Sequence, residues 1–243
     1  MPKKSYLAAI FVVMLAAITV YADTYGPEEP AADMSMVAGA LASVNFGTDD
    51  PIAVGSVVVA SWHSRSVLVF NITSIPQGST VSNATLALNI AGVTGSPTTF
   101  KIKRLVPVPT SVGMTWNNYT TGTAWPGSAG ASTSGTDFYA AEISTITAPS
   151  GTGSFTITSN STFTAMIQDA VDLSIFRSAR FVMVSDDEGA LKSWSFNTKE
   201  NATAGLRPKL TVEFTSPTTT STVTTTSTST STTLVQQALI ITE

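Results

Sequence analysis

Aromatic and amide side chains concentrate in one stretch of this 243-residue chain, between positions 107 and 136. Trp116, Asn117, Tyr119 and Trp125 lie there among many Gly, Ser and Thr residues. Aromatic rings and planar hydrogen-bonding groups suit contact with a sugar ring, and loops on a rigid sheet commonly carry binding residues. We therefore predict carbohydrate contact at these four positions. The alternative is that Trp116 fills the core of the fold, and the sequence leaves both interpretations open.

Lys101 and Lys103, followed by Arg104, form the one basic cluster of the chain. Side chains two residues apart on a strand point to the same face, so the two lysines are candidates for contact with an anionic glycan. The net charge of the chain is −4. That acidity makes a strongly anionic ligand less expected, and it argues against nucleic-acid binding, which needs a basic face.

Three consecutive carboxylates, Asp186, Asp187 and Glu188, precede Gly189. Asp and Gly are favoured in turns for backbone reasons alone, so a solvated turn between strands is the first interpretation. Calcium binding through carboxylate and carbonyl oxygens is the second. A carboxylate pair of a glycoside hydrolase, with Glu200 as a further candidate, is the third.

Glu200 is also expected to form an ion pair with Arg65 or Arg207 that holds the last strand in place. Buried charges are tolerated when they are paired. Contact of these residues with a ligand is the alternative.

Nucleophilic and metal-dependent catalysis have little support. His63 is the only histidine, there is no cysteine, and no Gly-x-Ser-x-Gly motif is present. A thiolate nucleophile, a disulfide and a multi-histidine metal centre are thereby excluded, and His63 is expected in a turn. We predict no catalytic residue, no enzyme activity and no cofactor other than the candidate calcium.

The central region consists of short apolar runs separated by Gly, Pro, Ser, Thr and Asn. Several of the runs alternate with period two, as half-buried antiparallel strands do. The runs are residues 57–61, 67–72, 84–91, 100–105, 153–158, 179–185, 192–197 and 208–214. They predict an all-β fold, an antiparallel β-sandwich of the jelly-roll kind.

One segment departs from the strand pattern, because five apolar residues recur there at helical spacing. They are Phe163, Met166, Ile167, Ala170 and Val171. The spacing predicts one short helix over residues 162–172, packed on an end of the sandwich, with Ser161 or Thr162 as its N-cap.

The two ends of the chain differ from the centre. Lys3 and Lys4 precede an apolar run that closes on Val20-Tyr21-Ala22, which is typical of a cleavable secretory signal; an uncleaved anchor is the alternative. The expected organisation is a signal peptide at 1–22, a flexible lead-in at 23–34, a β-sandwich at 35–214, a Ser/Thr-rich linker at 215–233 and an apolar tail at 234–243. This organisation predicts a secreted or cell-surface protein with no stable membrane span after cleavage.

Five asparagines stand in Asn-x-Ser/Thr sequons, which are candidate N-glycosylation sites. They are Asn71, Asn83, Asn118, Asn160 and Asn201.

Several motifs occur in an order that resembles a known family. An Asn-x-Gly turn at 45–47 precedes an Arg-opened strand that ends in Phe at 65–70, and a Pro-x-Gly element follows at 75–86. A Thr-Trp-Asn-Asn turn occupies 115–118, and the closing elements lie at 195–200 and 207–214. The chain resembles the DNRLRE-type domain, also classed as carbohydrate-binding module family 96 and related to the disaggregatase-associated β-domains of archaeal surface proteins. It departs from the family pattern at 34–42, where the usual Asp-Ala stretch is missing.

The resemblance implies a β-sandwich attached to secreted or surface-anchored proteins. It also implies binding, for some members to polysaccharide such as alginate, without catalysis by the domain itself. The expected partner is thus a polysaccharide or a cell-surface glycan, and the expected role is carbohydrate binding or adhesion. The alternative is a structural subunit of a surface layer or filament, which would bind copies of itself when residues 234–243 add as a strand to a neighbour's sheet.

Overall fold

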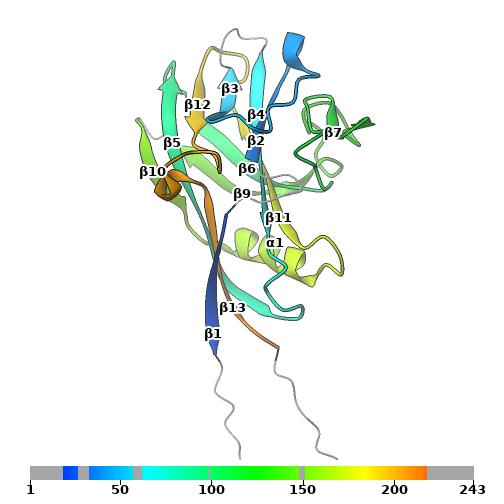
Figure 1. The fold of residues 1–243 in the computed structure, drawn as a ribbon, viewed down its shortest axis with the longest axis vertical. Coiled ribbons are helices and arrows are strands. Elements are labelled where there is room, and N and C mark those ends of the chain that lie inside the picture. Colours follow the sequence, from blue (N-terminus) through cyan, green and yellow to red (C-terminus); the bar gives the residue numbers. More distant parts are fainter. Residues whose placement is uncertain (1–18, 27–32, 57–61, 98, 148–150, 218–243) are drawn as a thin grey trace, which may run out of the picture.

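The computed structural model describes residues 19–26, 33–56, 62–97, 99–147 and 151–217. Its main feature is one antiparallel sheet that curls back on itself, so that two layers enclose a core (Figure 1). The described strands are β1 (Val20–Tyr25), β2 (Asp33–Val37), β3 (Ile52–Ser56), β4 (His63–Asn71), β5 (Thr80–Thr94), β6 (Thr99–Leu105), β7 (Asn118–Thr120), β8 (Thr123–Ala124), β9 (Phe138–Thr147), β10 (Gly153–Ile157), β11 (Ser178–Ser185), β12 (Ser193–Phe196) and β13 (Lys209–Thr215). The predicted all-β sandwich class is confirmed.

The sheet follows the order β1-β13-β5-β12-β3-β4-β11-β6-β9, with β10 added to β5 and β2 to β4. The hairpin β7–β8 forms a separate small sheet. Two short 3₁₀ helices, η1 (Gly39–Leu41) and η2 (Ala204–Leu206), occur in the connections. The long strand β5 pairs with β13 and β12 along one edge and with β10 along the other, and thereby joins the two layers.

The core between the layers is built from alternating side chains, as the period-two runs predict. On β5, Leu86, Leu88 and Ile90 are all buried. The ring of Phe100 on β6 packs against Trp194 and Phe196 of β12, with centroids 5.0 and 5.4 Å apart. Edge contacts of this kind add to the stabilisation that burial of the rings supplies.

The predicted helix is present as α1 (Ser161–Asp172), and its five predicted apolar residues are all buried. The N-cap differs from the expectation: the side chain of Asn160 accepts a hydrogen bond from the Phe163 N–H at 2.9 Å. The helix packs against β5, β9 and β11 and covers one end of the curled sheet (Figure 1).

Elements missed from the sequence concentrate near the N-terminus and on β9. The expected lead-in at 23–34 is wrong where it is described, because residues 23–25 lie in β1 and residues 33–34 open β2. Tyr21 stacks on Phe214 of β13 with centroids 5.6 Å apart, which gives β1 a partner that its polar composition does not suggest. His63, expected in a turn, begins β4.

Several predictions fall outside the described residues. These are the strand at 57–61, most of the signal peptide, and the linker and tail beyond residue 217. Within the described ranges, no helix combines the length and the apolar composition that crossing a bilayer requires. The two outermost described ends of the chain, in β1 and after β13, lie at the same end of the molecule (Figure 1).

A second apolar cluster lies on the outer face of the sheet, and we call it the outer cluster. Val67 and Val69 of β4 and Val182 of β11 face it, while their neighbours in sequence face the core. Met34 and Met36 of β2 extend it. The segment 106–137, which carries β7 and β8, folds over this face and is called the cap segment.

Candidate binding sites

Trp125 of the cap segment points into the outer cluster. Only 4% of its surface is exposed, and its Nε1 donates a hydrogen bond to the Thr115 carbonyl at 3.1 Å. The ring of Tyr119 packs beside it, with centroids 6.0 Å apart. In this arrangement the Trp125 indole covers the apolar strands beneath it, and its faces are not open to a sugar.

Trp116 is half-buried and is held from two directions. The guanidinium of Arg65 lies 5.1 Å from the centre of its ring. Gly130 lies so close that a Cβ added there would come within 2.5 Å of the ring. Glycine is needed at position 130 both for this approach and for its positive φ of 73°. The geometry favours the core-filling interpretation of Trp116 over the sugar-contact one.

Asn117 is exposed, but its amide donates to Ser43 Oγ at 3.1 Å. The four residues predicted to contact a sugar all lie in the cap segment. The structure brings Tyr119 and Trp125 together and turns Trp125 inward, so these side chains do not form an open aromatic surface.

Arg65 fastens the cap segment to the sheet. Its Nε and Nη2 donate to the two carboxylate oxygens of Glu188 at 2.7 and 2.8 Å. Its Nη1 donates to the Gly130 carbonyl at 2.7 Å and to Ser132 Oγ at 3.0 Å. Paired, bidentate geometry of this kind is among the stronger polar interactions in proteins.

The predicted ion pair is therefore correct for Arg65 as a paired residue but wrong in its partner. Glu200 lies 3.4 Å from Lys199 Nζ. Arg207 donates from Nε to the Asn201 carbonyl at 2.8 Å. The sequence missed Glu188 because the turn that carries it is 123 residues away from Arg65 in the chain.

The three acidic residues of the candidate calcium turn each have a cationic partner. Asp186 lies 3.2 Å from Lys101 Nζ, Asp187 lies 3.4 Å from Lys192 Nζ, and Glu188 holds Arg65. Within the described residues, no group of three or more His, Cys, Asp or Glu side chains is arranged to hold a metal ion. These ion pairs link the turn to β4, to β6 and to Lys192 directly before β12.

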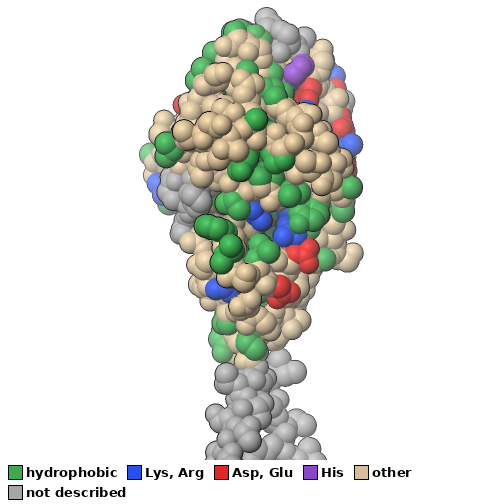
Figure 2. Space-filling model, turned by 90° about the vertical axis from the view of Figure 1, so that its right-hand side faces the viewer, with side chains coloured by type: hydrophobic (Ala, Val, Ile, Leu, Met, Phe, Trp, Pro, Cys, Tyr) green, Lys and Arg blue, Asp and Glu red, His purple; other side chains and the backbone are tan. Residues whose placement is uncertain are grey.

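Lys101 and Lys103 share one face of β6, as predicted, but acidic groups surround them. Glu142 Oε1 lies 3.5 Å from Lys101 Nζ and 3.6 Å from Lys103 Nζ. The hydrogen bond to Asp186 and the charge of Glu142 raise the pKa of Lys101. Figure 2 shows the same mixing of basic and acidic side chains over one face of the molecule. Little unbalanced positive charge is left for an anionic glycan.

Two of the five sequon asparagines use their amide nitrogen in the fold. Asn160 Nδ2 donates to the Ile143 carbonyl at 2.8 Å, and Asn201 Nδ2 donates to Asp50 Oδ2 at 2.8 Å. A glycan at either nitrogen requires that bond to break. Asn71, Asn83 and Asn118 are half-buried on β4, β5 and β7.

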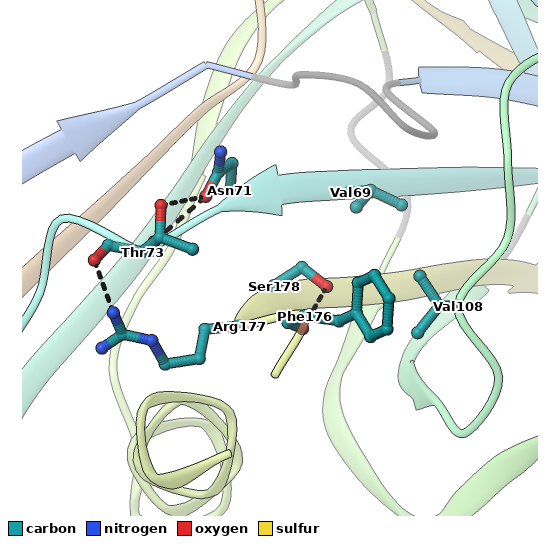
Figure 3. Close-up of a pocket in the computed structure, with 7 residues that line it drawn as sticks. All are labelled: Val69, Asn71, Thr73, Val108, Phe176, Arg177 and Ser178. Atoms are coloured by element: carbon teal, nitrogen blue, oxygen red, sulfur yellow. Dashed lines mark hydrogen bonds between the residues drawn. The ribbon is translucent and has the colours of Figure 1, made fainter. Parts of the chain in front are cut away.

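A groove of about 220 Å³ opens on the outer face of β4 and β11, next to the cap segment (Figure 3). Its lining residues are Val69, Asn71, Thr73, Val108, Phe176, Arg177 and Ser178. Phe176 forms one wall and is 67% exposed. Residue patterns alone do not single out Phe176. The available signal is the apolar pair Ile175-Phe176 in the loop after α1, where polar residues are usual.

A second, shallower hollow lies where β9 meets α1. Tyr139 is 41% exposed there. The guanidinium of Arg104 lies 4.6 Å from the centre of the Tyr139 ring and donates to Asp169 at 2.8 Å. The tyrosine ring is thus partly occupied by a neighbouring side chain.

Comparison with known proteins supports the resemblance noted from the motifs. Among curated proteins, none matches the chain. The family model for carbohydrate-binding module family 96 matches residues 25–168, from β1 into α1. The match covers more than half of the chain, and it includes the cap segment but ends before β11, β12 and β13. On this match, the chain belongs to carbohydrate-binding module family 96.

Proposed function

We propose that this chain is a secreted, surface-displayed module that binds carbohydrate or mediates adhesion and has no catalytic activity of its own. The observation that carries the proposal is its membership of carbohydrate-binding module family 96. The leader-like N-terminus and the Ser/Thr-rich segment after β13 support export and display.

The arrangement of the two chain ends agrees with display. The described ends of the chain, in β1 and after β13, lie at one end of the molecule (Figure 1). The cap segment lies toward the other end of the sheet. A module attached through the segment that follows β13 would present its cap segment and its outer face to a glycan.

Candidate catalytic groups have structural partners, which supports a non-catalytic role. His63 Nδ1 lies 2.6 Å from the Glu188 carbonyl, which occupies the nitrogen that a triad carboxylate would orient. Asp169, Asp186 and Glu188 are each in an ion pair. A hydrolase would need one carboxylic acid and one carboxylate on opposite sides of a sugar.

Binding is tested with residues 23–243 on a glycan array and by co-sedimentation with insoluble polysaccharides, each with and without calcium. We expect retention on at least one glycan class and no release of reducing sugar. An unrelated β-sandwich of similar acidity is the control for non-specific retention. Failure to bind any glycan in either condition would refute the carbohydrate role.

Export is tested by N-terminal sequencing of the chain recovered outside the cell. A mature chain that begins at Asp23 is the expected result. An intact chain in the membrane fraction would support the uncleaved anchor. Mass analysis of the same material would report glycosylation, which we expect at Asn83 or Asn118 before Asn160 or Asn201, because the last two amides hold structural hydrogen bonds.

One observation favours the alternative of a self-assembling subunit. Cleavage before Asp23 would remove Val20–Ala22, which pair with residues 213–215 of β13. An edge of β13 would then be open to an added strand, such as residues 234–243 of a neighbouring copy. Deletion of residues 234–243 would abolish filaments or layers seen by electron microscopy. Monomers before and after deletion would refute this alternative.

A further inference from the structure

The loop between α1 and β11 holds a large apolar side chain in an unfavourable position. Phe176 is 67% exposed, and its backbone has a φ of 52°. A bulky residue is an outlier in this left-handed region, because its Cβ crowds the backbone. Backbone outliers concentrate at binding and catalytic sites, where the strained residue is held for its function. Phe176 is therefore a candidate ligand contact.

The groove beside Phe176 has an apolar part and a polar part. Figure 3 shows the Phe176 ring near Val69 and Val108, while Asn71 and Thr73 lie at the other end of the groove. A pyranose ring has a matching division, since its C–H groups form an apolar face and its hydroxyl groups form a polar rim. A mostly apolar wall with a few polar groups is the usual composition of a small-ligand site.

The cation in the groove directs its terminal hydrogen-bond donors at the protein. Arg177 is the one charged residue that lines the groove. Its Nη1 donates to the Ile75 carbonyl and its Nη2 donates to the Thr73 carbonyl at 2.7 Å. Both terminal nitrogens thus hold the turn after β4, so a ligand carboxylate or sulfate would have to compete with these two carbonyls for the guanidinium.

We propose that this groove binds one uncharged hexose unit of a glycan, with the C–H face of the sugar against the Phe176 ring and its hydroxyl groups toward Asn71 and Thr73. The proposal rests on the carbohydrate-binding function proposed above and adds where the sugar lies and that it is uncharged. Phe176, Arg177 and Ser178 lie beyond the residues that the family model matches, 25–168.

The matched pair Phe176→Ala and Ile175→Ala tests the location. Ile175 is equally exposed, at 68%, but does not line the groove. The whole mature chain, made in a host without N-glycosylation, is titrated with neutral oligosaccharides and with oligouronates by calorimetry. We expect Phe176→Ala to weaken binding of a neutral oligosaccharide by about tenfold or more, equivalent to about 1.4 kcal/mol. Ile175→Ala and Tyr139→Ala, the latter in the second hollow, should bind as the unmodified chain does.

The other outcomes separate this proposal from the proposed function. Equal binding by Phe176→Ala and the unmodified chain overturns the groove and leaves carbohydrate binding intact. Binding of oligouronates alone overturns the uncharged ligand and also leaves carbohydrate binding intact. No binding of any oligosaccharide by the unmodified chain overturns both. Thermal unfolding of each variant ensures that a lost affinity reflects the groove and not the fold.

Discussion

The cap segment and the loop that carries Phe176 lie next to each other but use aromatic residues in opposite ways. The cap segment contains Trp116, Tyr119 and Trp125, and all three are packed against protein atoms. The short loop between α1 and β11 contains a single aromatic residue, Phe176, and leaves it exposed. The richer segment serves packing, so the number of aromatic residues in a loop does not indicate binding.

The difference follows from what lies beneath each segment. Under the cap segment, β4 and β11 present valines on their outer face in addition to the apolar residues on their inner face. That face would be an exposed apolar patch without a cover, and burial of apolar area is the main stabilising contribution to folding. Beneath the Phe176 loop, the apolar residues of α1 already face the core. The phenylalanine ring therefore has no large apolar surface to bury.

The strongest test of this contrast compares Trp125→Ala with Phe176→Ala. Loss of the buried indole should lower the free energy of unfolding by about 3–5 kcal/mol, since a large cavity is left over the outer cluster. Loss of the exposed phenylalanine ring should change it by less than about 0.5 kcal/mol. Denaturant titration gives both values. A cost below about 1 kcal/mol for Trp125→Ala would mean that the cap segment is not a packed part of the fold.

The next test removes the attachment of the cap segment. Arg65→Met should lower the free energy of unfolding by about 2–3 kcal/mol, a value between those of exposed and buried ion pairs. The cost is of this size because the pair with Glu188 is only partly exposed. The Gly130 carbonyl also loses its donor. The second substitution, Glu188→Gln, should add little once Arg65 is gone. Arg207→Met is the matched control, with an expected change below about 0.5 kcal/mol, since Arg207 makes one exposed hydrogen bond. Additive effects of Arg65→Met and Glu188→Gln would contradict the coupling.

The sequence predicts the fold well where one residue type repeats with a clear period. The alternation in β5, β6, β11, β12 and β13 and the helical spacing in α1 all correspond to described elements. The pattern fails for β9, whose sequence FYAAEISTIT shows weak alternation because its outward residues are exposed and mixed. It fails for β1 too, since pairing with β13 and the Tyr21–Phe214 stack are long-range contacts.

The candidate site was harder to predict than the fold. Residue type suggests Trp116 and Trp125 as sugar contacts. Whether they are exposed depends on the valines on the outer face of β4, because the period-two pattern predicts only one buried face for that strand. The lysines were correctly placed on one face, but the acidic residues near them come from β9 and from the turn before β12. Phe176 was missed because its exposure depends on the tertiary packing of α1.

A buried carboxyl group on β2, beneath the cap segment, should make the stability of the fold depend on pH. Asp33 opens β2, which supplies Met34 and Met36 to the outer cluster, and its Oδ1 has no hydrogen-bond partner within the described residues. Burial, together with the charges of Glu200 and Asp50, raises the pKa of Asp33 to about 7, despite the hydrogen bond from the Lys199 amide and the charge of Lys199. The raised pKa favours the protonated native state. The resulting stability is fully present below about pH 4 and is lost as the pH rises through about 7.

Asp33→Asn removes the titrating carboxyl group and with it the loss of stability at high pH. A shift of about three units corresponds to about 4 kcal/mol, and the introduced amide needs a partner of its own, so we expect a net gain of about 2 kcal/mol at pH 8. The gain should disappear as the pH falls and become a cost of about 2 kcal/mol near pH 4, where Asp33 is protonated in the fold and only the penalty of the amide remains. Thermal unfolding of both proteins between pH 4 and 8 measures it. A constant difference across this range would show that Asp33 does not titrate in the fold.

The smallest expected effect concerns the exposed side of the comparison. Phe176→Gly relieves the left-handed backbone at position 176, which costs a non-glycine residue about 1–2 kcal/mol, while glycine adds about 0.5–1 kcal/mol of backbone entropy to the unfolded state. The variant should therefore gain about 0.5–1 kcal/mol in stability. Ile175→Gly, which has no such strain to relieve, should lose a similar amount. A Phe176→Gly variant that is more stable but binds neutral oligosaccharide about tenfold more weakly would show that Phe176 lowers the stability of the fold and contributes to ligand binding. A loss of stability in Phe176→Gly as large as in Ile175→Gly would mean that the ring contributes packing, and the contrast with the cap segment would fail.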